Sequence, residues 1–510
     1  MKSYRSMITL VLILVASGLA AQENYFTPDI FVPTSDQVFE IGMGGEAIAS
    51  EEFTSREFFD FSYNSEYFGF VAAASFNQDG KYAPDKSTLP DRSLFSSYFL
   101  MDQGAMVFRG LDMQLEVGRK DHQDVVDTPY SLFISSKNNP ALLANFRYEN
   151  DFAFYETRWM ELNSRSGVAT PAFPAPEDGG NYFPDRGAQL KTYGFKLGGM
   201  RFGFQDAAVY TERSFDLEYF VSPLPNYLIQ YVKGTEGRPW STDNNENDIM
   251  GFFWDWTPDD DLYLNAQVLI DDLNVFGLGG TPRNPWKAAY TLGARWQTEA
   301  GTFGLYHALA TKYTFAPTRD SIKPVHAYSY TYYPDTRFLY SGDDYSAISV
   351  EDMMIGYYNG ENNIALRFDY DTVLKGTSLA TSLELVLSGP KSPANAWHEE
   401  TWYPEPGTKL LDTSTLEKKL VLKAQGSRRF GNFVGFSTMT AGVAINALEL
   451  QPGVVDYSDA LIDTWDKEDQ NANIWIWRPG DATEFTWSLS LGLRYEIPVM
   501  KALGREGSGN

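Results

Sequence analysis

The sequence predicts an all-β fold, a transmembrane antiparallel up-and-down β-barrel of about 18 strands, and three observations lead to it. Apolar and polar residues alternate with a period of two over runs of about ten residues, as in strands that face lipid on one side and a lumen on the other. Tight turns and long segments alternate between these runs. Aromatic residues make up 15% of the chain, which suits aromatic girdles at two membrane interfaces.

The N-terminus predicts export. A short basic region precedes the apolar run Met7–Val15, and the small residues of Ser17–Ala21 follow it. Because the run is shorter than the roughly 20 residues of a membrane-spanning helix, we expect a signal peptide over residues 1–21 that is cleaved on export. No later segment resembles such a helix, so if the exported chain is a membrane protein, it must cross the membrane as strands. We predict that residues 22–510 form a single barrel in the cell outer membrane, with long extracellular loops and a short C-terminal tail.

The alternation is clearest in four runs. In 485–497, Phe, Trp, Leu, Tyr and Ile side chains share one face, and polar residues occupy the other. Residues 113–118, 262–271 and 364–370 alternate in the same way. Soluble strands average about five or six residues, so these longer runs disfavour a soluble β-sandwich or propeller.

The connections predict an orientation. Tight turns are expected at Glu149–Asp151, Leu197–Gly199, Pro258–Asp261 and Glu299–Gly301. Long segments lie at 119–141, 164–188, 212–248, 273–286 and 447–484. Since short turns face the periplasm in bacterial barrels, we expect the long segments to be extracellular. The strand count stays open before residue 110 and within 313–376, where 325–341 holds one strand, two or none.

Composition argues against several functions. The chain has 41 Lys and Arg against 67 Asp and Glu, so its formal charge is 41 − 67 = −26, which disfavours binding of nucleic acid. With no Cys, it has no disulfide, thiolate metal site or Cys nucleophile. The four His show no zinc-ligand spacing, and no GxSxG motif marks a nucleophilic Ser. We expect no catalytic residue and no enzyme, with a barrel hydrolase left as a less favoured alternative because a fold can bring Ser and His together.

Acidic clusters are candidates for a calcium ion. Asp271–Asp272 ends a strand at the predicted outer rim, and Asp343–Asp344 lies in the region of uncertain strand count. Their carboxylate oxygens are ligands that Ca²⁺ accepts. There is no twelve-residue calcium loop, so we favour solvated rim acids and expect no cofactor, with Ca²⁺ at the acidic loop rim as the alternative.

The predicted external loops combine Trp with Asp, Asn, Glu and Tyr. Indole faces can stack on sugar rings, while amides and carboxylates accept hydrogen bonds from hydroxyl groups. The glycan-binding candidates are Trp397, Trp402, Trp475 and Trp477. The alternative is that several of these rings belong to an interfacial girdle.

The polar faces of the predicted strands supply candidates that line the lumen. These are Gln114, Glu116, Asn265, Gln267 and Arg295. In a channel, such side chains would set the ion preference. A porin-like channel for small solutes is therefore the alternative function.

Four stretches resemble the Wzi-type capsule-assembly family of outer-membrane barrels. They are LEVGRK at 115–120, LFISSKNNPALL at 132–143, VSPLP at 221–225 and QVLIDDL at 267–273. The resemblance implies an 18-stranded barrel in a Gram-negative-type bacterium that binds capsular or other surface polysaccharide without catalysis. The partners expected are outer-membrane lipid, surface polysaccharide and the outer-membrane assembly machinery, and no nucleic acid.

Two features depart from that family. The family has helical structure between its signal and its barrel, whereas residues 22–50 here read as extended, with a possible strand at 37–44. The last strand is followed by a tail from Pro498 to Asn510 instead of ending on an aromatic residue. Because glycan contacts in the family lie in variable loops, none of its functional residues is carried over to this chain.

Overall fold

The computed structural model describes residues 34, 37–78, 97–137, 140–166, 184–235, 237–241, 246–272, 285–316, 329–338, 346–394, 407–452 and 475–501. The predicted signal peptide, residues 1–21, lies outside the described residues, as do residues 502–510 of the predicted tail.

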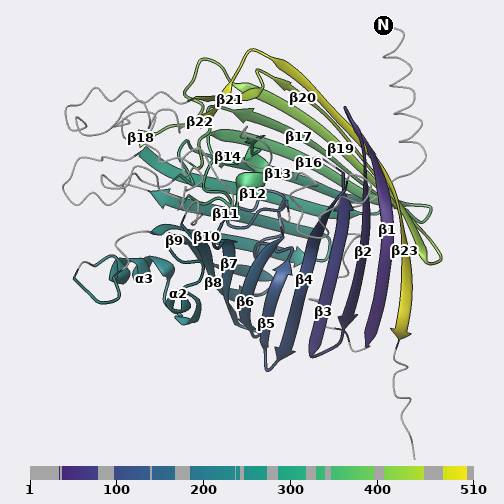
Figure 1. The fold of residues 1–510 in the computed structure, drawn as a ribbon, viewed down its shortest axis with the longest axis horizontal. Helices are drawn as coiled ribbons and strands as arrows, with labels where there is room; N and C mark the ends of the chain where they lie inside the picture. The colour runs from purple at the N-terminus through teal and green to yellow at the C-terminus, as the bar shows by residue number, and fades with distance from the viewer. Residues whose placement is uncertain are drawn as a thin grey trace, which may run out of the picture.

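Eighteen strands in the described part of the chain form a closed antiparallel barrel, as the sequence predicts (Figure 1). Each strand pairs with the next along the barrel, and β23 pairs back with β1, which leaves no free edge. The strands are β1 (Val38–Ala49), β2 (Phe53–Asn64), β3 (Phe68–Asn77), β4 (Tyr98–Gly110), β5 (Met113–Lys120), β6 (Ala141–Glu149), β7 (Ala153–Asn163), β8 (Arg186–Leu197), β9 (Met200–Thr211), β10 (Glu246–Asp259), β11 (Leu262–Asp272), β12 (Pro285–Thr298), β13 (Gly301–Ala310), β16 (Asn363–Leu374), β17 (Thr377–Ser388), β19 (Glu417–Phe430), β20 (Phe433–Ile445) and β23 (Thr483–Lys501).

The two faces of the strands differ as the alternation predicts. On β11, Val268 is 42% exposed on the outer face, whereas Gln267 and Leu269 on the lumen face are 1% and 0% exposed. On β23, Leu491 is 56% exposed on the outer face. Large apolar side chains are stable at the outer surface of such a barrel because lipid, not water, surrounds them.

The four predicted tight turns join β6 to β7, β8 to β9, β10 to β11 and β12 to β13. Gly198 and Gly199 have φ of 54° and 79°, a left-handed conformation that glycine adopts without strain and that a two-residue hairpin turn needs. The predicted long segments connect the opposite strand ends. The sequence therefore predicts the alternation of short and long connections correctly.

The structure assigns the described residues of the two regions of uncertain strand count. Strands β1 to β4 lie between residues 38 and 110, and β1 covers the expected strand at 37–44 except for its first residue. The described part of 325–341 holds no barrel strand, only the short β14 (Arg337–Phe338), which pairs with β15 (Ser346–Ala347) ahead of the one-turn helix α4 (Val350–Met353). The long segment before β23 contains a hairpin of β21 (Leu448–Pro452) and β22 (Trp475–Pro479).

The expected start of the C-terminal tail at Pro498 is wrong. Strand β23 continues to Lys501, and Pro498 lies opposite Glu40, where the pairing of β1 with β23 shifts register. Proline has no N–H to donate to the ladder, so it is tolerated at such an irregularity without ending the strand.

Three long segments do not simply extend from the barrel end. The segment after β5 folds into the lumen together with parts of the segment between β13 and β16. The segment after β9 carries the helices α2 (Leu217–Val221) and α3 (Asn226–Lys233), which lie outside the wall in Figure 1. None of the described helices is long and apolar enough to cross a membrane.

Candidate functional site

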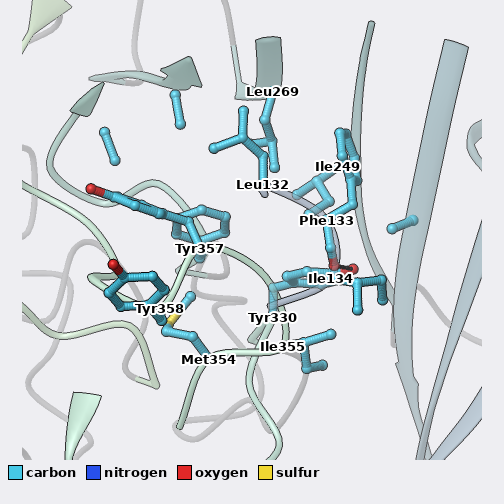
Figure 2. Close-up of a cluster of buried hydrophobic side chains, with 14 of the residues drawn as sticks. Leu132, Phe133, Ile134, Ile249, Leu269, Tyr330, Met354, Ile355, Tyr357 and Tyr358 are labelled. Carbon is cyan, nitrogen blue, oxygen red and sulfur yellow. Dashed lines mark hydrogen bonds between the residues drawn. The ribbon is translucent and has the colours of Figure 1, made fainter. Parts of the chain in front are cut away.

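Three segments fill part of the lumen, and we call residues 121–137, 329–336 and 348–362 together the plug. Their buried side chains pack against the lumen faces of β6 to β13, β16 and β17 in one apolar cluster. Figure 2 shows that residues from all three segments meet wall residues of β10 and β11 there; labelled are Leu132, Phe133, Ile134, Ile249, Leu269, Tyr330, Met354, Ile355, Tyr357 and Tyr358. The plug thus has a core of the kind found in soluble proteins.

A carboxylate and an amide fix the first plug segment to the wall. Asp124 accepts hydrogen bonds from Gln205 Nε2 at 2.7 Å and Gln267 Nε2 at 3.1 Å. It also accepts one from the backbone N–H of Phe133 at 3.1 Å. The side-chain oxygen of Gln267 accepts from the N–H of Leu132 at 3.0 Å. Strands β9 and β11 therefore hold the turn of the segment in place.

A buried cation holds the second segment. Arg186 of β8 is 0% exposed and donates to the carbonyl oxygens of Ser329 at 3.0 Å and Thr331 at 2.9 Å. The Tyr330 hydroxyl in turn donates to the carbonyl of Phe133 at 2.7 Å. Burial of a charge is costly unless hydrogen bonds satisfy it, and here the plug backbone supplies them.

Glu384 of β17 joins the first and third segments. Its Oε1 accepts from the hydroxyls of Tyr130 at 3.0 Å and Tyr358 at 2.7 Å, and from Asn359 Nδ2 at 3.1 Å. One wall carboxylate thereby ties together two parts of the chain that are far apart in sequence.

His122 lies in the first segment and is 3% exposed. Its Nε2 is 2.9 Å from the Tyr332 hydroxyl, and its Nδ1 is 3.5 Å from the guanidinium of Arg158. Burial and the nearby charges of Arg158 and Lys120 lower the pKa of His122 well below its ordinary 6.5. The imidazole is therefore neutral at pH 7, and it links two plug segments as a hydrogen-bonding group.

Further ion pairs line the lumen face of the wall. Arg201 pairs with Asp255 on the neighbouring strand, and Arg367 pairs with Asp369 at 2.6 Å. Arg295 pairs at 2.6 Å with Asp127 of the plug. A carboxylate therefore matches each of these three cations of the lumen face.

The five candidates for the lumen lie on the inner face, and four of them have partners within the protein. Gln114 donates to Glu116, which pairs with Lys120 at 2.7 Å. Gln267 holds the plug, and Arg295 pairs with Asp127. Asn265 is buried, and its amide has no hydrogen-bond partner among the described residues.

Sequence reasoning missed the residues that hold the plug, above all Asp124, Arg186 and Glu384. Each makes its contacts with residues far away in the chain, so no local spacing marks it. The one available signal was that LFISSKNNP at 132–140 is a conspicuously apolar start for a segment expected to lie in water.

Two of the four glycan candidates are described. Trp475 and Trp477 lie two residues apart on β22, with Ile476 buried between them. The guanidinium of Arg337 lies over the Trp475 ring, 3.6 Å from its centroid. Trp397 and Trp402 lie outside the described residues. The β21–β22 hairpin thus presents an indole whose orientation a cation helps to fix.

Lys391 connects this hairpin to the plug. Its backbone N–H donates to the carbonyl of Trp477 at 2.8 Å, and its carbonyl accepts from the N–H of Trp477 at 3.0 Å. Its ammonium donates to the carbonyl of Asn359 at 2.6 Å. Burial lowers the pKa of Lys391 to about 8. The rim hairpin and the third plug segment are therefore one connected structure.

The acidic rim does not form a described metal centre. Asp271 pairs with Lys287 at 2.8 Å and accepts from the N–H of Phe315 at 2.9 Å, so its carboxylate is already engaged. Asp343 and Asp344 lie outside the described residues. Within the described ranges, no group of three or more His, Asp or Glu side chains is arranged to hold a metal ion.

Comparisons with known proteins give likenesses among solved structures alone. No family model matches the chain, and no curated protein matches it. Wzi, an outer-membrane protein involved in group 1 capsule assembly in Escherichia coli and described as a carbohydrate-binding β-barrel, is 11% identical, with a TM-score of 0.48 and coverage of 91% of this chain and 84% of that one.

Two further solved structures are similar to about the same degree. Pseudomonas aeruginosa OprD is 8% identical, with a TM-score of 0.43 and coverage of 93% of this chain and 99% of that one. Acinetobacter baumannii OccAB2 is 10% identical, with a TM-score of 0.44 and coverage of 91% and 98%. At these identities the likenesses concern the fold and do not choose between the functions. On its own geometry, a closed set of strands with an apolar outer face, this chain has the fold of an outer-membrane β-barrel.

Proposed function

We propose that this chain is a non-enzymatic protein of the outer membrane whose loop end binds surface polysaccharide of the capsular type, as in the Wzi-type family that its sequence resembles. Export would remove residues 1–21, and the outer-membrane assembly machinery would insert the barrel. The observation that carries the proposal is the plug. It packs against the lumen faces of ten barrel strands, which disfavours a permanently open solute path and favours the loop end as the binding surface.

The β21–β22 hairpin supplies the chemistry for a sugar. An indole ring offers an apolar face to the C–H groups of a pyranose ring. Arg337 stacks on the Trp475 ring and so restricts the orientation of the indole before any ligand binds. Binding therefore costs less side-chain entropy at Trp475. Lys391 and the paired backbone of Trp477 fix the base of the hairpin. Such a shallow site gives modest affinity per sugar, and repeated units along a polymer would add avidity.

A channel is the second candidate, and the charged lumen face favours it. Arg201, Arg295 and Arg367 lie on the inner wall, where they could guide a small anionic solute if the plug moved. Arg295 pairs with Asp127 of the plug, whereas Arg201 and Arg367 pair with wall carboxylates, so displacement of the plug would free the guanidinium of Arg295.

The test compares retention on native surface polysaccharide with conductance in planar bilayers, using refolded protein. Trp475→Ala should weaken retention about 3- to 10-fold per binding unit, the range of one aromatic contact. Trp240→Ala is the matched control, because Trp240 is a loop-end indole next to an arginine, Arg238, as Trp475 is next to Arg337. The barrel fold, read from heat-modifiable migration, should persist in both variants.

Three outcomes would overturn the proposal. Large steady currents without retention would favour the channel. Equal retention by both Trp variants and the unchanged protein would remove the hairpin from the site. Hydrolysis of lipid or peptide bonds that disappeared on changing a single His would show an enzyme instead.

A further inference from the structure

The segment after β9 covers the outside of the barrel wall, and we call residues 212–235 the flap. Three side chains on the outer faces of β7 and β8 donate to its carbonyl groups. Trp159 Nε1 donates to Ser214 at 2.7 Å, Thr157 donates to Phe220 at 3.0 Å, and Tyr193 donates to Pro223 at 3.0 Å.

Thr157 and Trp159 lie on the opposite face of β7 from Met160, which packs against the plug, and Tyr193 of β8 lies opposite Tyr155 on that same outer face. The flap therefore descends along the lipid side of the wall, beside β7 to β9, where Figure 1 shows α2 and α3.

The wall beneath the flap is polar where its neighbours are apolar. Thr157, Lys191 and Asp206 lie side by side in one cross-strand row and are all buried. On the neighbouring strands, the same row continues with the apolar side chains of Phe146 on β6 and Met250 on β10. An uncovered charge on the lipid face of a barrel costs about 2–4 kcal/mol near mid-bilayer, so this patch requires a cover.

The flap makes hydrogen bonds to the polar groups of the patch. The ammonium of Lys191 donates to the carbonyl of Leu224 at 2.6 Å. The carboxylate of Asp206 accepts from the N–H of Tyr227 at 3.3 Å, and Asn226 Nδ2 donates to the Asp206 carbonyl at 2.9 Å.

The flap is also held together as a unit. Asp216 caps α2 and pairs with Lys233 at the end of α3 at 2.6 Å and with Arg213 at 2.8 Å. Its two helices therefore keep a fixed arrangement while they cover the wall.

The outward surface of the flap is apolar. Leu217 and Val221 on α2 are 61% and 62% exposed, and Leu224, Leu228, Tyr231 and Val232 are exposed as well. Monomeric proteins in water rarely expose such a contiguous patch. The patch adjoins the aromatic part of the lipid-facing surface, since the Tyr193 that anchors Pro223 lies 5.3 Å from the Tyr155 ring and 6.1 Å from that of Phe204.

We propose that the flap is a lipid-binding surface, whose exposed apolar side chains lie among the acyl chains of the bilayer. It supplies the lipid-facing surface that the polar row of β7 to β9 lacks, and its backbone forms hydrogen bonds with Lys191 and Asp206 beneath it. The proposal rests on the barrel spanning a membrane but not on polysaccharide binding.

Single cysteines carrying a nitroxide spin label test the proposal, with the full mature chain in phosphatidylcholine vesicles. The chain has no native Cys to confuse the labelling. Val221→Cys and Leu228→Cys report on the flap, Val268→Cys on the lipid-facing wall, and Asp260→Cys on an exposed tight turn. The measured quantity is the ratio of collisions with oxygen, which enters the bilayer, to collisions with a water-soluble nickel chelate.

We expect that ratio to be several-fold higher at both flap positions than at Asp260 and to match the ratio at Val268. A flap ratio equal to that at Asp260 would overturn the proposal, because the flap would then lie in water. Labels inaccessible to both reagents, with Leu228→Cys chains that oxidise to a dimer, would show that a second copy covers the patch, which also overturns it. Loss of polysaccharide retention would leave these ratios unchanged, so the two proposals fail separately.

Discussion

At the scale of single residues, the plug depends on a few polar side chains that serve the wall and a loop at once. The amide of Gln267 accepts from Leu132 and donates to Asp124, both in the plug, and also donates to Gln205 on the wall. Alternation along β11 predicts that this side chain faces inward, and it does. Its partners could not be predicted, because Leu132 is 135 residues away in sequence.

Gln267→Leu should loosen the plug, because it leaves the N–H of Leu132 buried without an acceptor. We expect a loss of about 1–3 kcal/mol in the free energy of unfolding, the cost of an unsatisfied buried group. Urea unfolding in lipid vesicles measures it. Gln297→Leu, at the exposed end of β12, is the control and should change little; equal losses would mean that the plug bonds do not matter.

His122 should make the plug sensitive to acid. Its pKa in the folded protein is well below 6.5, whereas in the unfolded chain it is ordinary, so the unfolded state binds more protons below that pH. The stability that depends on a neutral His122 is therefore complete above about pH 6.5 and falls by up to about 1.4 kcal/mol per pH unit below it. Unfolding curves at pH 7.5 and 5.0 measure this, and His122→Gln should flatten the difference. An identical pH dependence in the variant would contradict the assignment.

At the scale of elements, the sequence predicts strands well where lipid fixes one face. Strands β11 and β23 alternate because their outer residues must be apolar, and the glycines of the β8–β9 turn mark it locally. The segment between β13 and β16 has no such constraint. Its described parts fold into the lumen, where apolar residues such as Ile355 and Tyr357 pack in a core without strand periodicity. That is why 325–341 could not be assigned from its pattern.

The flap illustrates the same limit from the outside. Lys191 and Asp206 interrupt the apolar outer faces of β8 and β9. In the sequence pattern alone, this interruption argues against lipid-facing strands. The break is compensated by residues of the following segment, and a strand pattern contains no information about them.

Leu491→Arg tests whether the outer face of β23 meets lipid. The substitution puts a charge into the bilayer and should lower the free energy of unfolding by about 2–4 kcal/mol. Ser488→Arg, on the other face of the same strand, should cost clearly less, because its charge reaches the polar lumen. Urea unfolding in vesicles gives both values. Equal costs would mean that the two faces meet similar surroundings.

At the scale of the whole molecule, closure of the barrel joins the two ends of the described chain. Arg494 of β23 makes two hydrogen bonds to Asp60 of β2, at 2.6 and 2.9 Å, across the intervening β1. Gly42 of β1 makes room for this pair, because a Cβ there would lie 2.3 Å from the Arg494 guanidinium. The sequence predicted closure only from the general rule that membrane strands leave no edge. It gave no signal for this buried pair.

Closure with alternating connections also fixes which residues share an end of the barrel. Three barrel strands, β13, β16 and β17, lie between the turn after β12 and the segment before β19. Because each strand crosses from one end of the barrel to the other, the two connections lie at opposite ends. If short turns face the periplasm, Ala300 in the β12–β13 turn faces the periplasm. Ser414, which is exposed just before β19, then faces the outside of the cell.

Labelling of whole cells tests this orientation with two small substitutions in a chain that has no Cys of its own. A membrane-impermeant maleimide should react with Ser414→Cys on intact cells and should reach Ala300→Cys only after the outer membrane is opened. Both variants should label equally in detergent, which controls for the reactivity of each thiol. Labelling of Ala300→Cys alone on intact cells would invert the barrel, and the rim hairpin with Trp475 would then face the periplasm, where no surface polysaccharide could reach it. The direction of the strands is therefore the property on which the proposed function most directly depends.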